Sequence, residues 1–217
     1  WRLRRLLRVS APEVVHGWMY HANIAATLAS MGSNIPVVWG IRHSLHDLVE
    51  EKRTTRLVIR AGALLSRQPR RVLYNSAVSA RQHEVVGYAA NRTRVVPNGF
   101  DTDTFRPDAA ARRQMREELS LSPDVFLIGL VARVHPIKDH SNFLRAAQLF
   151  AASRPEAHFV LVGDGADAGN AQITNWIDDL GLLGRVHLCG RRTDIAAIDA
   201  ALDIASCSSW GEAFPNA

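Results

Sequence analysis

Two cations near the middle of the chain have a spacing that suits an anion. Arg133 closes the apolar segment at residues 126–133, and Lys138 follows after a loop broken by Pro136. The apolar segment is typical of a strand buried on both faces, and a helical pattern begins near Asp139. Cations at the carboxyl end of a parallel strand, beside a helix N-terminus, favour anion binding. An arginine fork paired with a mobile lysine predicts a diphosphate site, and the alternative is an ordinary loop with two solvated cations.

The segments that must position this loop alternate between short apolar runs and helical patterns. Such alternation predicts an α/β fold with parallel sheets and right-handed crossovers. The polar, turn-rich stretch at residues 101–107 predicts a junction between two incomplete, doubly wound domains, at 1–106 and 107–217. Strands are expected at residues 12–18, 35–43, 71–76, 94–100, 126–133, 158–165, 185–190 and 203–209. Helices are expected at residues 1–9, 21–31, 49–66, 77–87, 109–119, 142–153, 170–180 and 194–202.

Charge is distributed unevenly along the 217 residues. Residues 1–106 hold 16 Lys and Arg against 7 Asp and Glu, whereas residues 107–217 hold 10 against 14. This asymmetry argues against one uniform nucleic-acid surface, and the basic half favours anionic substrates or an anionic membrane surface. The arginine-rich helix at residues 1–9 is either a membrane-surface helix or the end of a helix that packs on a sheet.

The two cysteines, Cys189 and Cys207, lie in apolar contexts without metal-ligand spacing. We expect both to be buried, reduced thiols of a cytoplasmic protein. No apolar run approaches the ~20 residues of a membrane span, and no signal-peptide pattern is present. The chain begins inside a helical pattern without Met and stops just after a strand-to-helix loop, so we expect a fragment truncated at both ends.

Several short motifs follow expected strands, where open α/β sheets bind their ligands. They are VPNGFD, the Arg133–Lys138 loop, VGDG, GRRTD and SSWGEAFPN, with WMYHAN and RHS upstream. In this order and spacing the chain resembles the retaining, nucleotide-sugar-dependent glycosyltransferases of family 4. The resemblance implies the GT-B fold, in which two Rossmann-like domains face each other. The first mainly binds the acceptor and the second binds the nucleotide-sugar.

The resemblance also implies roles for residues of the second half. Arg133 and Lys138 match the pair that holds the donor diphosphate, where fixed cations stabilise the leaving group. Glu212 matches the first glutamate of a paired motif and is implied to be catalytic. Further donor-binding positions are Gly163, Asp164 and Gly165 beside the nucleotide, Arg191 with its neighbours Gly190 and Arg192 near the base, and Phe214, Pro215 and Asn216 along the donor sugar and phosphates.

In the first half, the resemblance implies that His43 of the RHS motif reaches the donor sugar or its phosphate as a second catalytic residue. His16 matches the first position of an H-x-H pattern whose second position is Trp18 here, and His21 is a candidate to face the cleft instead. Asn98 and Gly99 are expected to shape the junction on the acceptor side. A structural histidine is the other interpretation of each of the three imidazoles.

The implied reaction transfers a hexose from a nucleoside-diphosphate sugar, with UDP expected, to a glycan or lipid-linked acceptor in surface polysaccharide synthesis. The configuration is retained, no metal or other cofactor is needed, and no nucleic acid takes part. We expect a cytoplasmic protein, at the inner face of the membrane if the basic half contacts lipid. The fragment, without the family's glycine-rich first loop, is expected to be inactive. The alternatives are a GT-B-type sugar-nucleotide epimerase, a dinucleotide oxidoreductase, for which VGDGADAG is a poor fingerprint, and a non-catalytic binding module.

Overall fold

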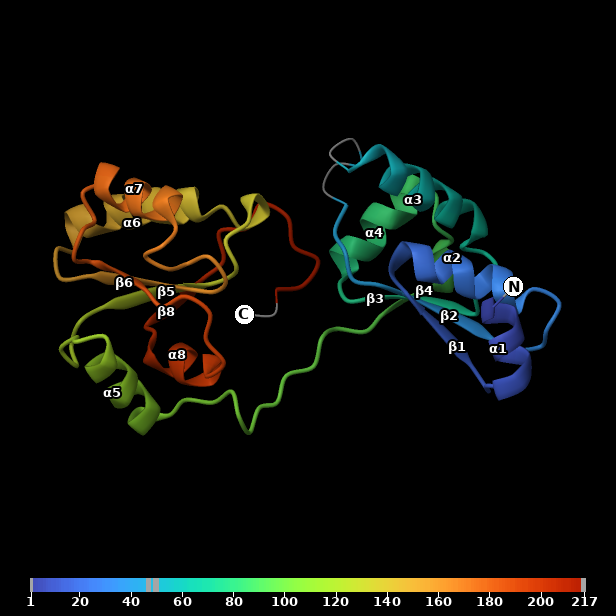
Figure 1. Cartoon of the computed structure of the whole chain (residues 1–217), viewed down its shortest axis with the longest axis horizontal. Coiled ribbons are helices and arrows are strands. Elements are labelled where there is room, and N and C mark those ends of the chain that lie inside the picture. Colours follow the sequence, from blue (N-terminus) through green and yellow to red (C-terminus); the bar gives the residue numbers. More distant parts are fainter. Residues whose placement is uncertain (1, 46–47, 49–50, 216–217) are drawn as a thin grey trace. The chain divides into compact units, whose positions relative to one another are not determined.

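The computed structural model describes residues 2–45, 48 and 51–215, which form two compact units (Figure 1). Among these residues, the first unit comprises 2–98 and 211–215, and the second comprises 99–210. The division by contacts falls between Asn98 and Gly99, whereas the sequence placed the domain junction between residues 106 and 107. Each unit contains its own sheet and its own hydrophobic core.

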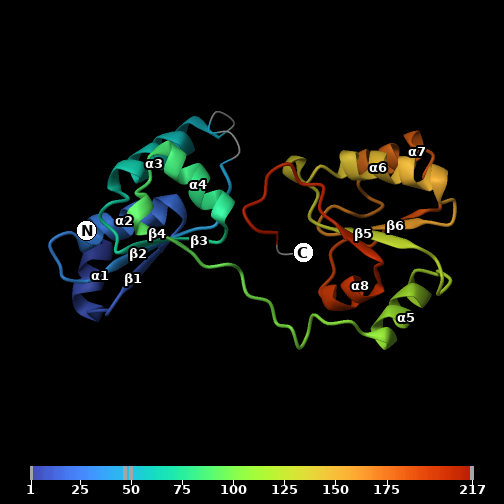
Figure 2. The ribbon, with the colours of Figure 1, turned by 180° about the vertical axis from the view of Figure 1, so that it is seen from behind.

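The first unit is a parallel sheet whose four strands follow one another in chain order. Because every crossover runs in the same direction and is right-handed, the connecting helices lie on one face, as α3 and α4 do in Figures 1 and 2. Trp39, Ile41, Val72, Tyr74 and Ile59 are almost fully buried there. The strands are β1 (Val15–Trp18), β2 (Val37–Ile41), β3 (Arg71–Tyr74) and β4 (Thr93–Val95). The helices are α1 (Arg2–Ser10), α2 (Met19–Ser30), α3 (Arg53–Leu65), α4 (Ala77–Val86) and the 3-10 turn η1 (Ala90–Arg92).

The second unit is also a parallel sheet, but its strand order is β7-β6-β5-β8. Helices α6 and α7 cover one face, and α5 and α8 cover the other (Figure 1). The chain therefore moves from β5 to one side and returns for β8 on the other, which makes the carboxyl ends of β5 and β8 a topological switch point. The strands are β5 (Leu127–Val131), β6 (His158–Val162), β7 (Val186–Leu188) and β8 (Ile204–Ser206). The helices are α5 (Ala109–Glu118), α6 (His140–Ser153), α7 (Ala171–Asp179), α8 (Ile195–Ala201) and the 3-10 turn η2 (Pro136–Lys138).

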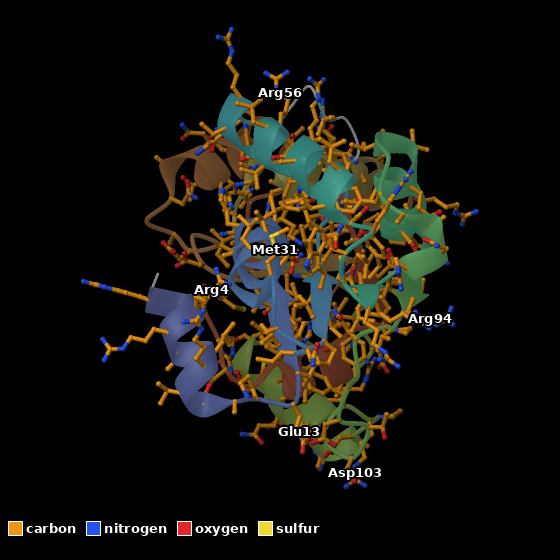
Figure 3. All side chains as sticks on the ribbon, turned by 90° about the vertical axis from the view of Figure 1, so that its right-hand side faces the viewer. Arg4, Glu13, Met31, Arg56, Arg94 and Asp103 are labelled. Atoms are coloured by element: carbon orange, nitrogen blue, oxygen red, sulfur yellow. The ribbon has the colours of Figure 1, made fainter. Side chains whose placement is uncertain are left out.

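The predicted fold class is confirmed, and each expected strand and helix is present. Most are shorter than expected, but α2 and α6 each begin two residues earlier, β4 begins one residue earlier and α1 ends one residue later. Helix α1 packs against α2, and its residue Leu7 is buried. Arg4 of α1 donates a hydrogen bond to the carbonyl of Met31, just after α2, and Figure 3 labels Arg4 and Met31. No helix within the described residues is long and apolar enough to cross a bilayer.

The prediction of two buried thiols is wrong for Cys207, which is exposed, and only partly right for Cys189, which is half-buried. Both thiols are free. Cys207 follows the last residue of the short strand β8, so neither sheet face covers it. Burial raises the pKa of the Cys189 thiol.

An arginine that the sequence did not single out lies inside the second unit. Arg116 is 2% exposed and donates to the carbonyls of Ala201, Pro123 and Val125 and to the carboxylate of Asp203. Asp203 also accepts the N–H of Leu127 at the start of β5. Burial alone would raise the pKa of Asp203, but the N–H of Leu127 and the guanidinium groups of Arg112 and Arg116 lower it overall. A buried charge is costly unless it is paired and hydrogen-bonded, and Arg116 finds these partners next to the amino ends of β5 and β8. The network therefore holds α5 against those strand ends.

Candidate functional site

The loop after β5 carries the two cations at the switch point of the second unit. Arg133 is exposed two residues beyond the strand, and Lys138 is half-buried at the end of η2. Asp139 then adopts a left-handed conformation, with φ of 47°, and its carboxylate accepts the N–H of Asn142 to begin α6. The loop thus brings both cations to the N-terminal end of a 14-residue helix, an electrostatic setting that favours anions.

The glycine turn after β6 packs directly against this loop. The N–H of Ala132 donates to Val162 at 2.8 Å, and the N–H of Val134 donates to Asp164 at 2.8 Å. Gly163 has φ of +147°, and a Cβ there would lie 2.2 Å from the carbonyl oxygen of Ala132. Only glycine tolerates both the dihedral and the approach, so Gly163 sets the position of the Arg133 loop. Gly165 also has a positive φ, and the side chain of Asp164 is exposed.

A third loop, after β7, is joined to the glycine turn by backbone hydrogen bonds. The carbonyl of Gly190 accepts the N–H of Gly163 at 2.8 Å, and the N–H of Gly190 donates to Ala166 at 2.8 Å. The next residue, Arg191, is exposed. Arg192 instead forms ion pairs with Glu118 of α5 and with Asp194 before α8. Its charge therefore links this loop to α5 and to the start of α8.

The loop after β8 holds the lysine turn from the other side. Ser208 donates its hydroxyl to the carbonyl of Lys138 at 2.7 Å. Trp210 donates its backbone N–H to Ile137 and its indole N–H to Pro136, at 3.2 and 3.1 Å. Loops from all four strands are therefore connected, and these hydrogen bonds hold the backbone that carries Arg133 and Lys138.

The predicted donor-binding residues that follow Trp210 do not group with the unit that carries Arg133 and Lys138. Glu212, Phe214 and Pro215 group with the first unit, whereas Arg133 and Lys138 belong to the second. Glu212 and Phe214 are half-buried and Pro215 is exposed. Asn216 lies outside the described residues.

His43, in the first unit, is held by one residue of α4 and by one in the segment just before α3. Its carbonyl accepts the hydroxyl of Ser79 at 2.6 Å, and its Nε2 lies 2.7 Å from a carboxylate oxygen of Glu51. The side-chain oxygen of Gln82 accepts both the N–H of Leu45 and the hydroxyl of Ser44, each at 2.9 Å. The sequence singled out His43, but its support by α4 is visible only in the structure.

A buried imidazole lies beneath this loop. His83 lies between the rings of Tyr20, Tyr74 and Tyr88, and its Nδ1 is 2.7 Å from the carbonyl of Ser79. Because a carbonyl only accepts, Nδ1 carries the proton, and Nε2 accepts the hydroxyl of Tyr20 at 2.8 Å. Burial lowers the pKa of His83 to about 4, so the ring is neutral at pH 7. The ring of Tyr20 also contacts His43 edge-on, which links this cluster to the candidate residue.

Arg42 is an addition that the sequence did not identify, although it precedes His43 in the same loop. Its guanidinium lies over the ring of Trp18, 5.1 Å from the centroid, and hydrogen-bonds to the side-chain oxygen of Asn98. It thereby joins the carboxyl ends of β1, β2 and β4. His16 is exposed on β1 beside Trp18.

His21 is exposed in the first turn of α2, and Gly99 is exposed at the first position of the second unit. Within the described residues, no group of three or more His, Cys, Asp or Glu side chains is arranged to hold a metal ion.

Comparison with known proteins agrees with this architecture. Residues 1–104 match the family described as Glycosyltransferase Family 4, and residues 125–217 match Glycosyl transferases group 1. The D-inositol 3-phosphate glycosyltransferase of Mycobacterium ulcerans is 30% identical over 150 residues, which cover 66% of this chain and 31% of that protein.

Two solved structures are similar over nearly the whole chain. HepE of Anabaena in complex with UDP has a TM-score of 0.81 and 24% identity, covering 95% of this chain and 56% of that one. The sucrose-phosphate synthase of Thermosynechococcus elongatus has a TM-score of 0.80 and 19% identity, covering 98% and 54%. The chain thus spans about half the length of these structures. Because glycosyltransferase family models match both of its halves, the chain belongs to the glycosyltransferases of family 4.

Proposed function

We propose that the whole protein transfers a hexosyl unit from a nucleoside-diphosphate sugar, with UDP as the nucleotide, to a glycan or lipid-linked acceptor. The observation that carries this proposal is the loop of Arg133 and Lys138, fixed at the switch point by hydrogen bonds from the neighbouring loops. Fixed cations at this position suit a diphosphate, whose negative charge grows as the sugar–phosphate bond breaks. HepE has been solved with UDP and with UDP-glucose, which supports UDP as the nucleotide.

Each candidate residue has a role in this proposal. Arg133 and Lys138 bind the diphosphate, and Gly163 lets the nucleotide-side turn approach them closely. Glu212 contacts the donor sugar, and His43 contacts the sugar or its phosphate. The remaining donor contacts are Asp164, Gly165, Arg191, Phe214, Pro215 and Asn216, while His16, His21, Asn98 and Gly99 serve the acceptor side.

The reaction proposed is a transfer with retention of configuration and without a divalent metal. The two cations then provide the stabilisation of the leaving group that a metal supplies in other transferases. The expected setting is surface polysaccharide synthesis at the cytoplasmic face of the membrane, with the basic first half, 16 Lys and Arg against 7 acids in residues 1–106, nearest to anionic acceptors.

Calorimetric titration of the full-length protein with UDP, GDP, ADP and NAD tests the donor site. We expect UDP to bind and Lys138→Ala to remove that binding. The matched control is Lys52→Ala, because Lys52 is the chain's other lysine and is exposed before α3. Binding of NAD alone would contradict the proposal, and UDP binding that survives Lys138→Ala would contradict the diphosphate assignment.

Product analysis then separates a transferase from the alternatives. A transferase yields a new glycosidic bond and loses activity in Lys138→Ala, whereas an epimerase converts the UDP-sugar without an acceptor. Nucleotide binding without either product would indicate a non-catalytic module. Turnover should persist in EDTA, and a loss that only Mg²⁺ or Mn²⁺ reverses would refute the metal-free mechanism.

A further inference from the structure

Two imidazoles on neighbouring strands of the second unit form a pair that the proposed reaction does not use. His158 is the first residue of β6, and His187 is the middle residue of β7. Nδ1 of His158 lies 2.9 Å from Nε2 of His187, and the rings stack at 28° with centroids 5.2 Å apart. The strand register explains this, because His187 pairs with Val160, whose side chain shares a sheet face with that of His158.

The pair is well separated from the candidate donor site. His158 begins the strand that Gly163 follows, so the two positions are about 16 Å apart along β6 at roughly 3.3 Å per residue. Strand β7 is the edge of the sheet, and both imidazoles are only partly buried. An ion can therefore reach the pair from solvent without entering the donor site.

Both rings are in the form that binds metals. Burial is the main cause that lowers the pKa of each, assisted by Arg185 beside His158 and by His158 itself beside His187. A neutral imidazole has one nitrogen with a free lone pair, and it is the common protein ligand for zinc, copper and nickel. A carboxylate-rich site would instead favour Mg²⁺ or Ca²⁺.

We propose that His158 and His187 form a surface site for one divalent transition-metal ion, Cu²⁺ more tightly than Zn²⁺, with water in the remaining coordination positions. The ion lies between the two facing nitrogens and replaces their hydrogen bond. The ring that donated this bond shifts its proton to its other nitrogen, so no proton is released. Two metal–nitrogen bonds of about 2.0–2.1 Å span roughly 2.9 Å at a right angle and roughly 3.3 Å at a tetrahedral angle. The observed separation of 2.9 Å therefore needs at most a small rotation of the half-exposed rings. Cu²⁺ is expected to bind more tightly than Zn²⁺ because it has the highest affinity of the divalent first-row metal ions for nitrogen sites.

Only two protein ligands are offered, since no cluster of three or more metal-binding side chains occurs in the part of the chain that the structure describes. The affinity should consequently be lower than that of a structural zinc site with four protein ligands. It should also depend on both rings, because one imidazole alone provides no chelation.

The test is a titration of untagged full-length protein with CuCl₂ and ZnCl₂, with MgCl₂ as the negative comparison. We expect one Cu²⁺ per chain and weaker Zn²⁺ binding. His158→Gln and His187→Gln should each weaken Cu²⁺ binding by at least about tenfold, because even loss of an outer-shell partner costs roughly 10–100-fold. The control is His21→Gln, which removes an exposed imidazole from the other unit and should leave the affinity unchanged.

Two further readouts keep the test decisive. Circular dichroism establishes that each variant is folded, and electron paramagnetic resonance of the copper complex counts coordinating nitrogens, with two expected for the parent and one after His187→Gln. Unchanged Cu²⁺ affinity in both pair variants, or no binding by the parent at millimolar copper, overturns the proposal. Neither result bears on UDP binding, so the transferase proposal is tested separately.

Discussion

Replacing Gly163 by alanine introduces a methyl group where the structure has no room for one. The new Cβ would lie 2.2 Å from the carbonyl oxygen of Ala132 and 2.8 Å from the amide nitrogen of Arg133. Both are backbone atoms, so no side-chain rotation relieves the overlap. The φ of +147° is also a conformation that residues with a side chain rarely adopt.

The expected cost has two parts. The backbone conformation costs about 1–3 kcal/mol. The overlap can be relieved only if the turn moves away from the Arg133 loop. This movement should break the hydrogen bonds of Ala132 to Val162 and of Gly163 to Gly190, each worth about 1 kcal/mol. The free energy of unfolding should therefore fall by roughly 3–5 kcal/mol, which corresponds to a Tm lower by about 10 °C.

The assay is scanning calorimetry of the full-length protein, with Gly181→Ala as the matched control. Gly181 has a φ of +65°, but a Cβ there would meet nothing within 4 Å. Its replacement should therefore cost only the left-handed backbone penalty of about 1–2 kcal/mol, partly offset by a less flexible unfolded chain. Titration with UDP provides a second readout, because a displaced Arg133 should bind the diphosphate less tightly. Equal destabilisation by the two substitutions would show that the turn does not depend on close contact at Gly163.

Three further predictions concern stability and reactivity. Arg116→Met should lower the free energy of unfolding by about 3–5 kcal/mol in denaturant titrations, because it leaves buried acceptors without their donor. The control is Arg113→Met, which should have almost no effect because Arg113 is exposed. The folded-state pKa of His83 is about 4, below its unfolded value of 6.5, so stability should fall by up to about 3 kcal/mol between pH 6.5 and pH 4. His83→Gln should flatten that part of the profile, and an unchanged slope would contradict the assignment. A thiol reagent should label Cys207 faster than Cys189, because Cys207 is exposed and burial raises the pKa of Cys189; equal rates would count against this.

The sequence by itself determined the elements and the loops that carry the candidate chemistry. Apolar periodicity and glycine or proline breaks are local properties, so the alternation of strands and helices could be predicted with small errors at the ends. The five-residue spacing of Arg133 and Lys138 and the glycines of the VGDG turn are equally local. Because the carboxyl ends of parallel strands lie at the same edge of a sheet, the gathering of these loops could also be predicted.

Only the tertiary structure decided which strands and side chains become neighbours. Periodicity shows that a segment is a strand but not where it enters the sheet, so the position of β8 beside β5 was not visible in the sequence. The support of Lys138 by Ser208 follows from that position. The burial of Arg116 and the meeting of His158 with His187 likewise depend on packing between segments far apart in the chain. Long-range packing selects these neighbours, because each position is fixed by the burial and hydrogen bonding of the whole unit.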